Sequence, residues 1–395
     1  MVRVYAKSGI PHLFSALIAC GLMVAILSIG YTVAIRLEQR TISSTAPEVF
    51  PLKYQGLAFQ RAAAHAPEVL PLYGSSELII PPVPEKAGKF FRTAPTGFQV
   101  SPVGNLGATT ATILQKIGAL GSDLRGKKVV ISLSPGWFLA SGTRWDWYKG
   151  NFSLLAASEL IFGSSIDFQL KRDIALRMLE CPSTLKRSPL LEFALSRLAS
   201  GSQLDRLVFC ALWPLGKIQN AILDLQDHFA ALSYILRDTK PTPRRQIEML
   251  NWPNLIAKAT ESTSADAAKF EKVPGAIRRW HDAGFVARIN TAPEWIDFEL
   301  LLRVLAQAHA QPLLLSMPMA GQYYDRIGVS RIARETYYKR MRTLAQRYRF
   351  SLVQFEDHDN DSAFLDNQEN HLTKKGWIFY DRALDDFFHG RVPPM

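Results

Sequence analysis

The sequence lacks the features that mark several classes of protein. Its three cysteines, Cys20, Cys181 and Cys210, are too few for a disulfide scaffold, lack the spacing of a zinc site and leave the redox compartment open. Internal repeats and low-complexity tracts are absent, which argues against fibrous proteins. There is no HExxH helix and no aromatic-interleaved basic motif. We therefore expect no metal, no cofactor and no nucleic-acid partner.

What is present is typical of a folded, basic protein. The chain has 395 residues, of which 48% are hydrophobic and 21% charged, and this length supports a large core without disulfides. Its formal net charge is +11. A charge of this sign predicts attraction to polyanions such as anionic lipids or phosphate polymers.

The amino-terminal region contains one long uncharged apolar run, residues 13 to 35. At about 1.5 Å per helical residue, such a run crosses a hydrocarbon core of roughly 30 Å. We expect a single transmembrane helix after a short segment of residues 1 to 12. Lipoprotein processing at Cys20 is the alternative, but it would leave some fifteen apolar residues at the new terminus. The basic residues on the two sides of the run are nearly balanced, so charge alone does not orient it.

The rest of the chain reads as an α/β domain. Residues 36 to 66 contain Pro47 and Pro51, are followed by Pro67 and are expected to form a polar tether. Within residues 67 to 395, short apolar runs end at turn residues and alternate with helical patterns, which predicts a parallel sheet flanked by helices. The expected strands are residues 69–73, 127–133, 312–317 and 351–355. The helical interval from about 150 to 290 is expected to be an insertion at the carboxyl edge of the sheet.

Two distant segments carry residues suited to acyl transfer. Gly74-Ser75-Ser76-Glu77 follows the first predicted strand, where parallel sheets collect their functional groups. Serines at such a place also cap helices, so this segment alone is weak evidence. His371 lies in a polar stretch after two carboxylates, and a serine, a histidine and an acid are each chemically necessary for this kind of acyl transfer. The rival His358 is expected to be a solvated loop residue, with metal ligation as the alternative.

Three segments together resemble the DltD family of teichoic-acid D-alanylation proteins. They are Leu72-Tyr73-Gly74-Ser75-Ser76-Glu77-Leu78, Ile131-Ser132-Leu133-Ser134-Pro135-Gly136-Trp137-Phe138, and His371-Leu372 with Gly376-Trp377. Their order and spacing fit the family, and the resemblance extends over nearly the whole chain. DltD proteins are similar to SGNH-type esterases, which implies an SGNH-hydrolase-like fold.

The resemblance implies a catalytic Ser76 and a base at His371. Asp366 is our preferred acid because the family position three residues before the histidine is occupied by Gln368, with Glu369 as the other substitute. Gly107, Asn105 and Trp137 are the implied oxyanion or substrate-binding residues. The sequence departs from the family by having Gly136 in place of the usual glutamine of the second segment, and no SGNH-type Gly-x-Asn-Asp block is visible.

The resemblance also implies a function and a location. We expect a cell-membrane protein with a cytoplasmic amino terminus and an extracytoplasmic domain that performs a serine-dependent acyltransferase or esterase step in D-alanylation of lipoteichoic acid or a related polymer. Its implied partners are a membrane-bound O-acyltransferase and an acyl-carrier protein. One alternative is a non-catalytic partner that binds the carrier and scaffolds the acyltransferase, and another is O-acetylation or deacylation of a different surface polysaccharide.

Overall fold

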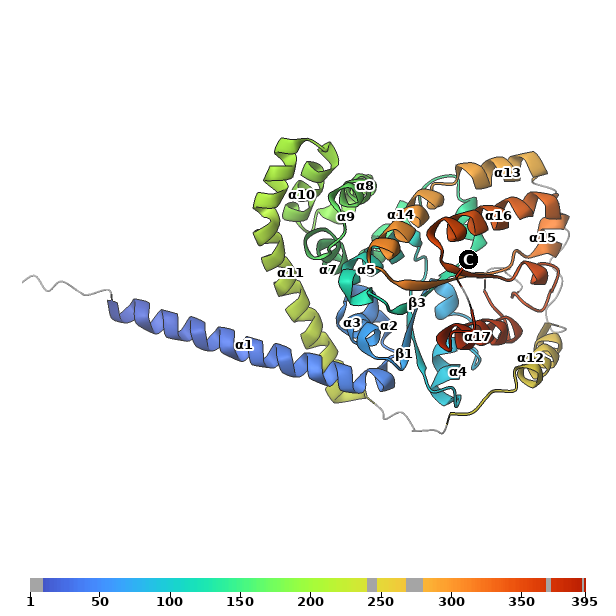
Figure 1. Cartoon of the computed structure of the whole chain (residues 1–395), viewed down its shortest axis with the longest axis horizontal. Helices are drawn as coiled ribbons and strands as arrows, with labels where there is room; N and C mark the ends of the chain where they lie inside the picture. The colour runs from blue at the N-terminus through green and yellow to red at the C-terminus, as the bar shows by residue number, and fades with distance from the viewer. Residues whose placement is uncertain (1–9, 240–246, 268–279, 367–370, 393) are drawn as a thin grey trace, which may run out of the picture.

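A five-stranded parallel sheet forms the centre of the molecule (Figure 1). The computed structural model describes residues 10–239, 247–267, 280–366, 371–392 and 394–395. The strands are β1 (Val69–Tyr73), β2 (Gln99–Val103), β3 (Lys128–Leu133), β4 (Gln311–Ser316) and β5 (Ser351–Gln354), in the spatial order β2-β1-β3-β4-β5. All neighbouring strands run parallel, so their carboxyl ends meet at one edge. The predicted α/β class is confirmed.

The sheet is apolar on both faces because helices cover both. Val129, Ile131 and Leu133 point into the larger core, whereas Val130, between them, points into the second core. This alternation is the period of a strand with two buried faces. The larger core includes α5 (Thr110–Leu120), α14 (Glu294–Gln307) and α16 (Arg331–Tyr348), and the second includes α4 (Ala87–Thr93) and α17 (Lys374–Phe388).

Strand β2 was not expected from the sequence. Its segment, Gln99-Val100-Ser101-Pro102-Val103, mixes polar and apolar residues and contains a proline, which cannot donate a backbone hydrogen bond. The strand lies at one edge of the sheet, where proline is tolerated. Its position matters for the site because the loop after β2 lies beside the turn after β1.

The amino-terminal helix α1 (Ile10–Thr45) is longer than the predicted apolar span. It is the one helix among the described residues that is long and apolar enough to cross a membrane. Large apolar side chains from Leu13 to Val33 are exposed along it, whereas Ala34 and Ile42 are buried. The helix therefore has an apolar free part and a part that packs against the body.

The predicted irregular tether over residues 36–66 is wrong. This segment contains the end of α1, α2 (Phe50–Gln55) and α3 (Ala58–His65), which pack into a hydrophobic cluster with Val69. Prolines misled the prediction because Pro51 occupies the first turn of α2, where a missing N–H costs nothing. Polar side chains of the segment are buried with partners; Lys53 Nζ donates to the Ala46 carbonyl across 2.7 Å.

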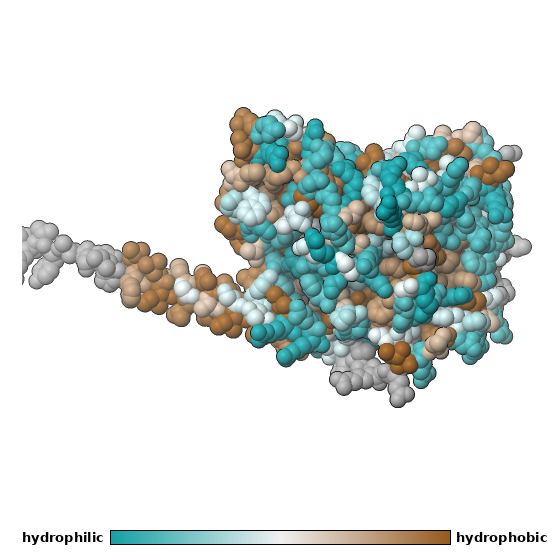
Figure 2. Space-filling view, viewed as in Figure 1, coloured by the Kyte–Doolittle hydropathy of each residue, from teal (hydrophilic) through white to brown (hydrophobic). Residues whose placement is uncertain are grey.

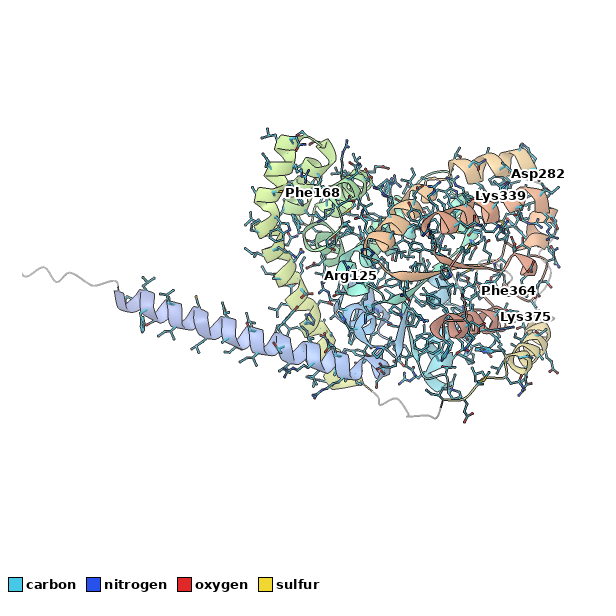
Figure 3. The ribbon with its side chains drawn as sticks, viewed as in Figure 1. Arg125, Phe168, Asp282, Lys339, Phe364 and Lys375 are labelled. Atoms are coloured by element: carbon cyan, nitrogen blue, oxygen red, sulfur yellow. The ribbon has the colours of Figure 1, made fainter. Side chains whose placement is uncertain are left out.

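The interval between β3 and β4 is helical, as predicted. After α6 (Trp145–Asn151) come α7 (Leu154–Ser158), a π-helical turn (Glu159–Gly163), α8 (Phe168–Leu179), α9 (Pro182–Leu185), α10 (Pro189–Ser200), α11 (Gln203–Asp238), α12 (Trp252–Ala267) and α13 (Asp282–Thr291). The part from α8 to α11 forms a lobe beside α5 and α14, and Phe168 of this lobe lies far from Asp282 of α13 (Figure 3). The interval reaches the carboxyl edge through Asn151, which binds the loop after β2, through α12, whose Ser262 accepts from Lys374, and through α13, which contacts the turn after β3. Between β4 and β5 the chain forms α15 (Gly321–Arg326) and then α16.

Candidate active site

The turn after β1 holds Ser76 at the carboxyl edge of the sheet. Gly74 ends the strand and donates its N–H to the Val103 carbonyl of β2 across 3.2 Å. A Cβ on Gly74 would lie 2.3 Å from the Glu77 carboxylate, and one on Gly104 would lie 2.7 Å from the Gly74 carbonyl. Gly104 therefore lets the loop after β2 approach the turn after β1, whereas Gly74 leaves room for the Glu77 carboxylate within the turn. The 3-10 turn Ser76–Leu78 begins at this point.

The two adjacent serines have different environments. Ser75 is buried, and its Oγ donates to the Asn105 carbonyl across 3.2 Å. Ser76 is half-buried, and its Oγ lies 2.9 Å from Nε2 of His371. Only Ser76 therefore has a base within hydrogen-bonding distance of its hydroxyl.

His371 is positioned by a short antiparallel pairing at the end of the chain. Leu365 and Leu372 form a β-bridge, and the Asp366 N–H donates to the His371 carbonyl across 2.8 Å. Thr373 caps α17 and its N–H binds the Phe364 carbonyl, which fixes the other side of the loop. Phe364 and Lys375, labelled in Figure 3, mark where these two segments lie in the body. This pairing places the Asp366 carboxylate beside the imidazole.

Asp366 lies on the side of the imidazole away from the serine. Its Oδ2 is 3.3 Å from Nδ1 of His371, and its Oδ1 lies 3.4 Å from the His371 backbone nitrogen. A carboxylate there favours the proton on Nδ1, which leaves Nε2 to accept from the Ser76 hydroxyl. The other acid considered, Glu369, and its neighbour Gln368 lie outside the described residues.

A second carboxylate, that of Glu77, lies beneath the turn. Glu77 is fully buried and accepts the Ser75 N–H across 2.9 Å. Burial raises the pKa of this carboxyl, while the backbone N–H groups of Ser75 and of Glu77 itself and the nearby His371 oppose the rise. Sequence reasoning missed its role, although a lone acid after Gly-Ser-Ser and before an apolar residue was an available signal. Its contact with Ser75 holds the backbone that presents Ser76.

The predicted residues Asn105 and Gly107 lie on the loop after β2. The Asn105 side-chain amide donates to Oδ1 of Asn151 across 3.2 Å, and Asn151 in turn donates to the Leu106 carbonyl across 3.0 Å. Gly107 has φ +72°, which favours glycine, and the Trp147 ring lies 3.3 Å from where a Cβ would be. Within the part of the chain that the structure describes, the N–H groups of Ser76 and Gly107 donate to no other group.

The structure does not bring Trp137 to the surface of the site. This residue is 5% exposed and belongs to the larger hydrophobic core, because the 3-10 turn Pro135–Leu139 directs its ring inward. We therefore assign it no substrate contact. The neighbouring Gly136 stands where the resemblance implies a glutamine. A Cβ added at Gly136 would have one atom within 4 Å, the Ser134 Oγ at 3.6 Å.

An arginine and a tryptophan that sequence reasoning missed border this region. The Arg144 guanidinium lies 4.2 Å from the centre of the Trp147 ring and donates to the Gly136 carbonyl across 3.3 Å. Burial lowers the Arg144 pKa and Glu294 opposes this, but an arginine stays charged at neutral pH. The run Arg144-Trp145-Asp146-Trp147 was the available signal for a cation held on an aromatic surface.

His358 differs from the expectation of a solvated loop residue. Its ring stacks on Phe364 with centroids 4.6 Å apart and also contacts Phe379. Its Nδ1 lies 3.3 Å from Oδ2 of Asp361. The residue is half-buried because the aromatic rings of two segments close around it, and it supports the segment that leads to Asp366.

Comparison with known proteins identifies the family. Residues 46–389 match the family described as DltD protein. Protein DltD of Bacillus subtilis (strain 168) is 26% identical over 366 residues, covering 89% of this chain and 90% of that protein. Protein DltD of Staphylococcus aureus (strain NCTC 8325 / PS 47) is 22% identical, covering 90% of each chain, and that of Lacticaseibacillus rhamnosus is 23% identical, covering 95% of this chain and 89% of the relative. The match extends over most of the chain and contains all three motifs, and the chain belongs to the DltD family.

Proposed function

We propose that this protein is a membrane-anchored, serine-dependent acyltransferase in the D-alanylation of lipoteichoic acid or a related anionic envelope polymer. The observation that carries the proposal is the 2.9 Å contact between Ser76 Oγ and His371 Nε2, with Asp366 on the opposite ring nitrogen. Such an arrangement turns a weakly nucleophilic hydroxyl into a group that attacks acyl carbons. Membership of the DltD family supports the choice of a D-alanyl group.

In the first half-reaction, Ser76 Oγ attacks the carbonyl carbon of an activated D-alanyl ester while His371 Nε2 takes the hydroxyl proton. The resulting imidazolium is stabilised by the Asp366 carboxylate. When the tetrahedral intermediate collapses, the bond to the donor oxygen or sulfur breaks and His371 returns the proton to that leaving group. Ser76 is left as a D-alanyl ester.

In the second half-reaction, a hydroxyl of the acceptor polymer replaces the donor. His371 removes its proton, the hydroxyl oxygen attacks the acyl-Ser76 carbonyl, and the Ser76 Oγ leaves with the proton from His371. The N–H groups of Ser76 and Gly107, which have no partner among the described residues, are available to stabilise the negative oxygen in both halves. Asn105 is held beside them by Asn151.

The charge of the protein supports an anionic acceptor. The formal net charge of +11 attracts a phosphate polymer over a long range, and Arg144 supplies a fixed, half-buried cation near the loop that carries Gly107. The apolar part of α1 supports a single membrane anchor. Membership of the DltD family supports an extracytoplasmic domain, and we therefore propose that the amino terminus is cytoplasmic. A membrane-bound O-acyltransferase and an acyl-carrier protein are the partners that we propose for delivery of the acyl group.

Complementation of a deletion strain tests this function. Strains would carry the wild-type chain, Ser76→Ala or Ser75→Ala, and D-alanyl esters released from the envelope by mild alkali would be quantified by mass spectrometry. We expect ester levels to fall to those of the deletion strain with Ser76→Ala and to stay near wild type with Ser75→Ala. Normal esters with a correctly inserted Ser76→Ala protein would exclude the covalent mechanism.

A further inference from the structure

The outward face of α11 carries a continuous row of apolar side chains. We call this row the outer stripe; it consists of Leu204, Leu207, Ala211, Leu215, Ile218, Ile222, Leu225, Phe229 and Leu236. The residues recur at helical intervals, with Ser233 between the last two, so they share one side of the helix. Most are strongly exposed: the exposed fraction is 72% for Leu204, 58% for Ile218 and 75% for Leu236. The row is about 48 Å long at 1.5 Å per residue.

The opposite side of α11 is the one that packs on the protein. Its buried residues, Phe209, Gly216, Asn220, Asp224, His228, Ala231 and Ile235, lie about half a turn away from the outer stripe. No charged residue of α11 falls within the stripe; Arg206, Lys217 and Asp227 are all on other sides. Water-facing helices normally place polar residues outward, and monomeric soluble proteins rarely expose an apolar surface of this extent.

Buried polar contacts fix α11 to α1. The Tyr31 hydroxyl donates to Oδ2 of Asp224 across 2.9 Å, and Nδ1 of His228 lies 2.7 Å from Oε1 of Glu38. Ile42 of α1 packs in one cluster with Ala231 and Ile235. The direction in which α1 leaves the body therefore also determines the direction in which the outer stripe faces.

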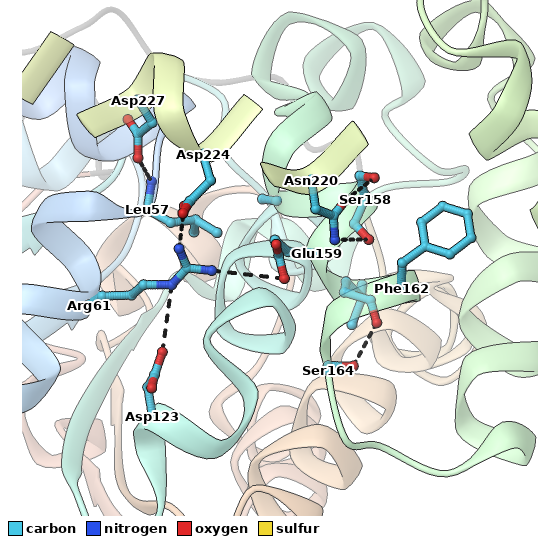
Figure 4. A network of polar contacts seen from close by, with 12 residues as sticks. Leu57, Arg61, Asp123, Ser158, Glu159, Phe162, Ser164, Asn220, Asp224 and Asp227 are labelled. Atoms are coloured by element: carbon cyan, nitrogen blue, oxygen red, sulfur yellow. Dashed lines mark hydrogen bonds and ion pairs between the residues drawn. The ribbon is translucent and has the colours of Figure 1, made fainter. Parts of the chain in front are cut away.

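A second set of contacts fixes α11 to the body (Figure 4). Asp224 pairs with Arg61 of α3, and Asp227 accepts the backbone N–H groups of Leu57 and Ala58 at 2.5 and 2.7 Å. Near the middle of α11, Asn220 and Ser158 share a buried hydrogen bond. These contacts make α11 part of a rigid unit and not a helix free to turn its apolar side inward.

The outer stripe lies on the side of the body from which α1 emerges. In Figure 1, α11 runs along that edge and crosses α1 at a steep angle, and Figure 2 shows hydrophobic surface there as well as on α1. The exposed apolar part of α1 ends at Val33, within one turn of the Tyr31–Asp224 contact. A bilayer that covers the apolar part of α1 would thus have its surface close to α11.

We propose that the outer stripe rests on the lipid bilayer, with its side chains inserted at the boundary between headgroups and acyl chains. This inference rests on the proposed membrane anchoring by α1. An uncharged row on one helix, lying across an anchoring helix, matches an interfacial amphipathic helix. The stripe also continues the apolar surface of α1 and has no charged group for pairing with a protein partner. The bilayer would then hold the body in one orientation and the Ser76 site at a fixed height.

Depth-dependent fluorescence quenching tests this inference on the full chain. In a Cys20→Ser/Cys210→Ser background, a bimane label would be attached at Ile218→Cys, Ile222→Cys, Leu22→Cys or Ile332→Cys. Leu22 is an exposed residue on the apolar part of α1, and Ile332 is an isolated apolar residue of α16 with 86% exposure. The proteins would be reconstituted in phosphatidylethanolamine–phosphatidylglycerol vesicles with or without nitroxide-labelled phosphatidylcholine.

We expect the nitroxide lipid to reduce the fluorescence severalfold at Ile218, Ile222 and Leu22 and to leave it unchanged at Ile332. Quenching at Leu22 without quenching at Ile218 and Ile222 would overturn the inference but leave the membrane anchor in place. This is the result expected if the outer stripe bound a protein and not lipid. Absence of quenching at Leu22 as well would overturn both the inference and the proposed anchoring. Equal thermal unfolding temperatures of the four labelled proteins would establish that the fold is intact.

Discussion

The imidazole of His371 lies 2.9 Å from the hydroxyl of Ser76, although 295 positions separate the two residues in the sequence. Strand β1 brings the serine to the carboxyl edge of the sheet, and the pairing of Leu365 with Leu372 brings the histidine to the same edge. Neither segment has a nucleophile and a base on its own. The fold therefore creates the reactive pair.

The identity of the acid can be tested by paired substitutions. Asp366→Asn keeps the size of the side chain but removes the charge 3.3 Å from His371 Nδ1, and it disfavours the tautomer that accepts from Ser76. We expect the rate of Ser76 labelling by a fluorophosphonate to fall about 10²- to 10⁴-fold. Glu369→Gln is the control and is expected to label at the wild-type rate. The reverse pattern would make Glu369 the acid.

Gly107 and Gly126 offer a matched pair for the proposed oxyanion group. Both have positive φ, at +72° and +67°, so alanine at either position costs roughly 1 kcal/mol of stability. Only at Gly107 does the new Cβ also meet a side chain, the Trp147 ring, 3.3 Å away, while space around Gly126 is open. We expect both variants to unfold at a lower temperature, Gly107→Ala by at least as much as Gly126→Ala, and the labelling rate to fall for Gly107→Ala alone. Equal labelling rates would remove Gly107 from the site.

The contact between α11 and α1 makes stability depend on pH. Burial lowers the His228 pKa, but hydrogen bonds and charges from Asp224 and Glu38 outweigh it and raise the pKa to about 9 from 6.5. Because the folded state holds this proton more tightly, the stabilisation is complete below about pH 6.5 and is lost as the pH rises through about 9.

Thermal unfolding of the full chain from pH 6 to pH 10 measures this effect. The loss across the window is roughly 2 to 4 kcal/mol for a shift of this size. His228→Asn is expected to unfold at a lower temperature than wild type at pH 6 and to lose less stability between pH 6.5 and 9. Parallel curves for the two proteins would show that His228 does not carry the proton.

Arg144 is expected to act on an anionic acceptor and not on the nucleophile. Arg144→Gln removes the cation that packs on Trp147, so transfer of D-alanine to the polymer should fall several-fold while labelling of Ser76 by a small neutral fluorophosphonate stays unchanged. Arg125→Gln, which removes an exposed cation before β3 (Figure 3), is the control and should affect neither reaction. Equal effects of the two variants on transfer would indicate a general charge effect.

The sequence predicted the strands that form the centre of the sheet because they are apolar runs closed by turn residues. It missed β2, whose Pro102 is tolerated because the strand is at an edge and whose buried Ser101 accepts from Lys53. It also predicted a tether over α2 and α3, because proline usually interrupts helices. In the structure Pro51 lies in the first turn of α2, and the two helices pack against the body. In both cases, tertiary contacts outweigh the local signal.

The site was predictable where a motif carries the chemistry and not where packing does. Ser76 and His371 stand in recognisable segments, and the structure places their side chains within hydrogen-bonding distance. The support from Asn151 depends on a carbonyl supplied by the loop after β2, which no local pattern encodes, whereas the contact of Glu77 with the Ser75 N–H is local to the turn. Trp137 shows the opposite case, because its ring turns into the core.

The most direct test is to label the full-length protein with a fluorophosphonate and map the modified peptide by mass spectrometry. We expect the label on Ser76 in the wild type and in Ser75→Ala, and a rate several powers of ten lower in His371→Ala. A folded wild-type protein that stays unlabelled, or that carries the label on Ser75, would contradict the assignment of Ser76 and His371 as nucleophile and base.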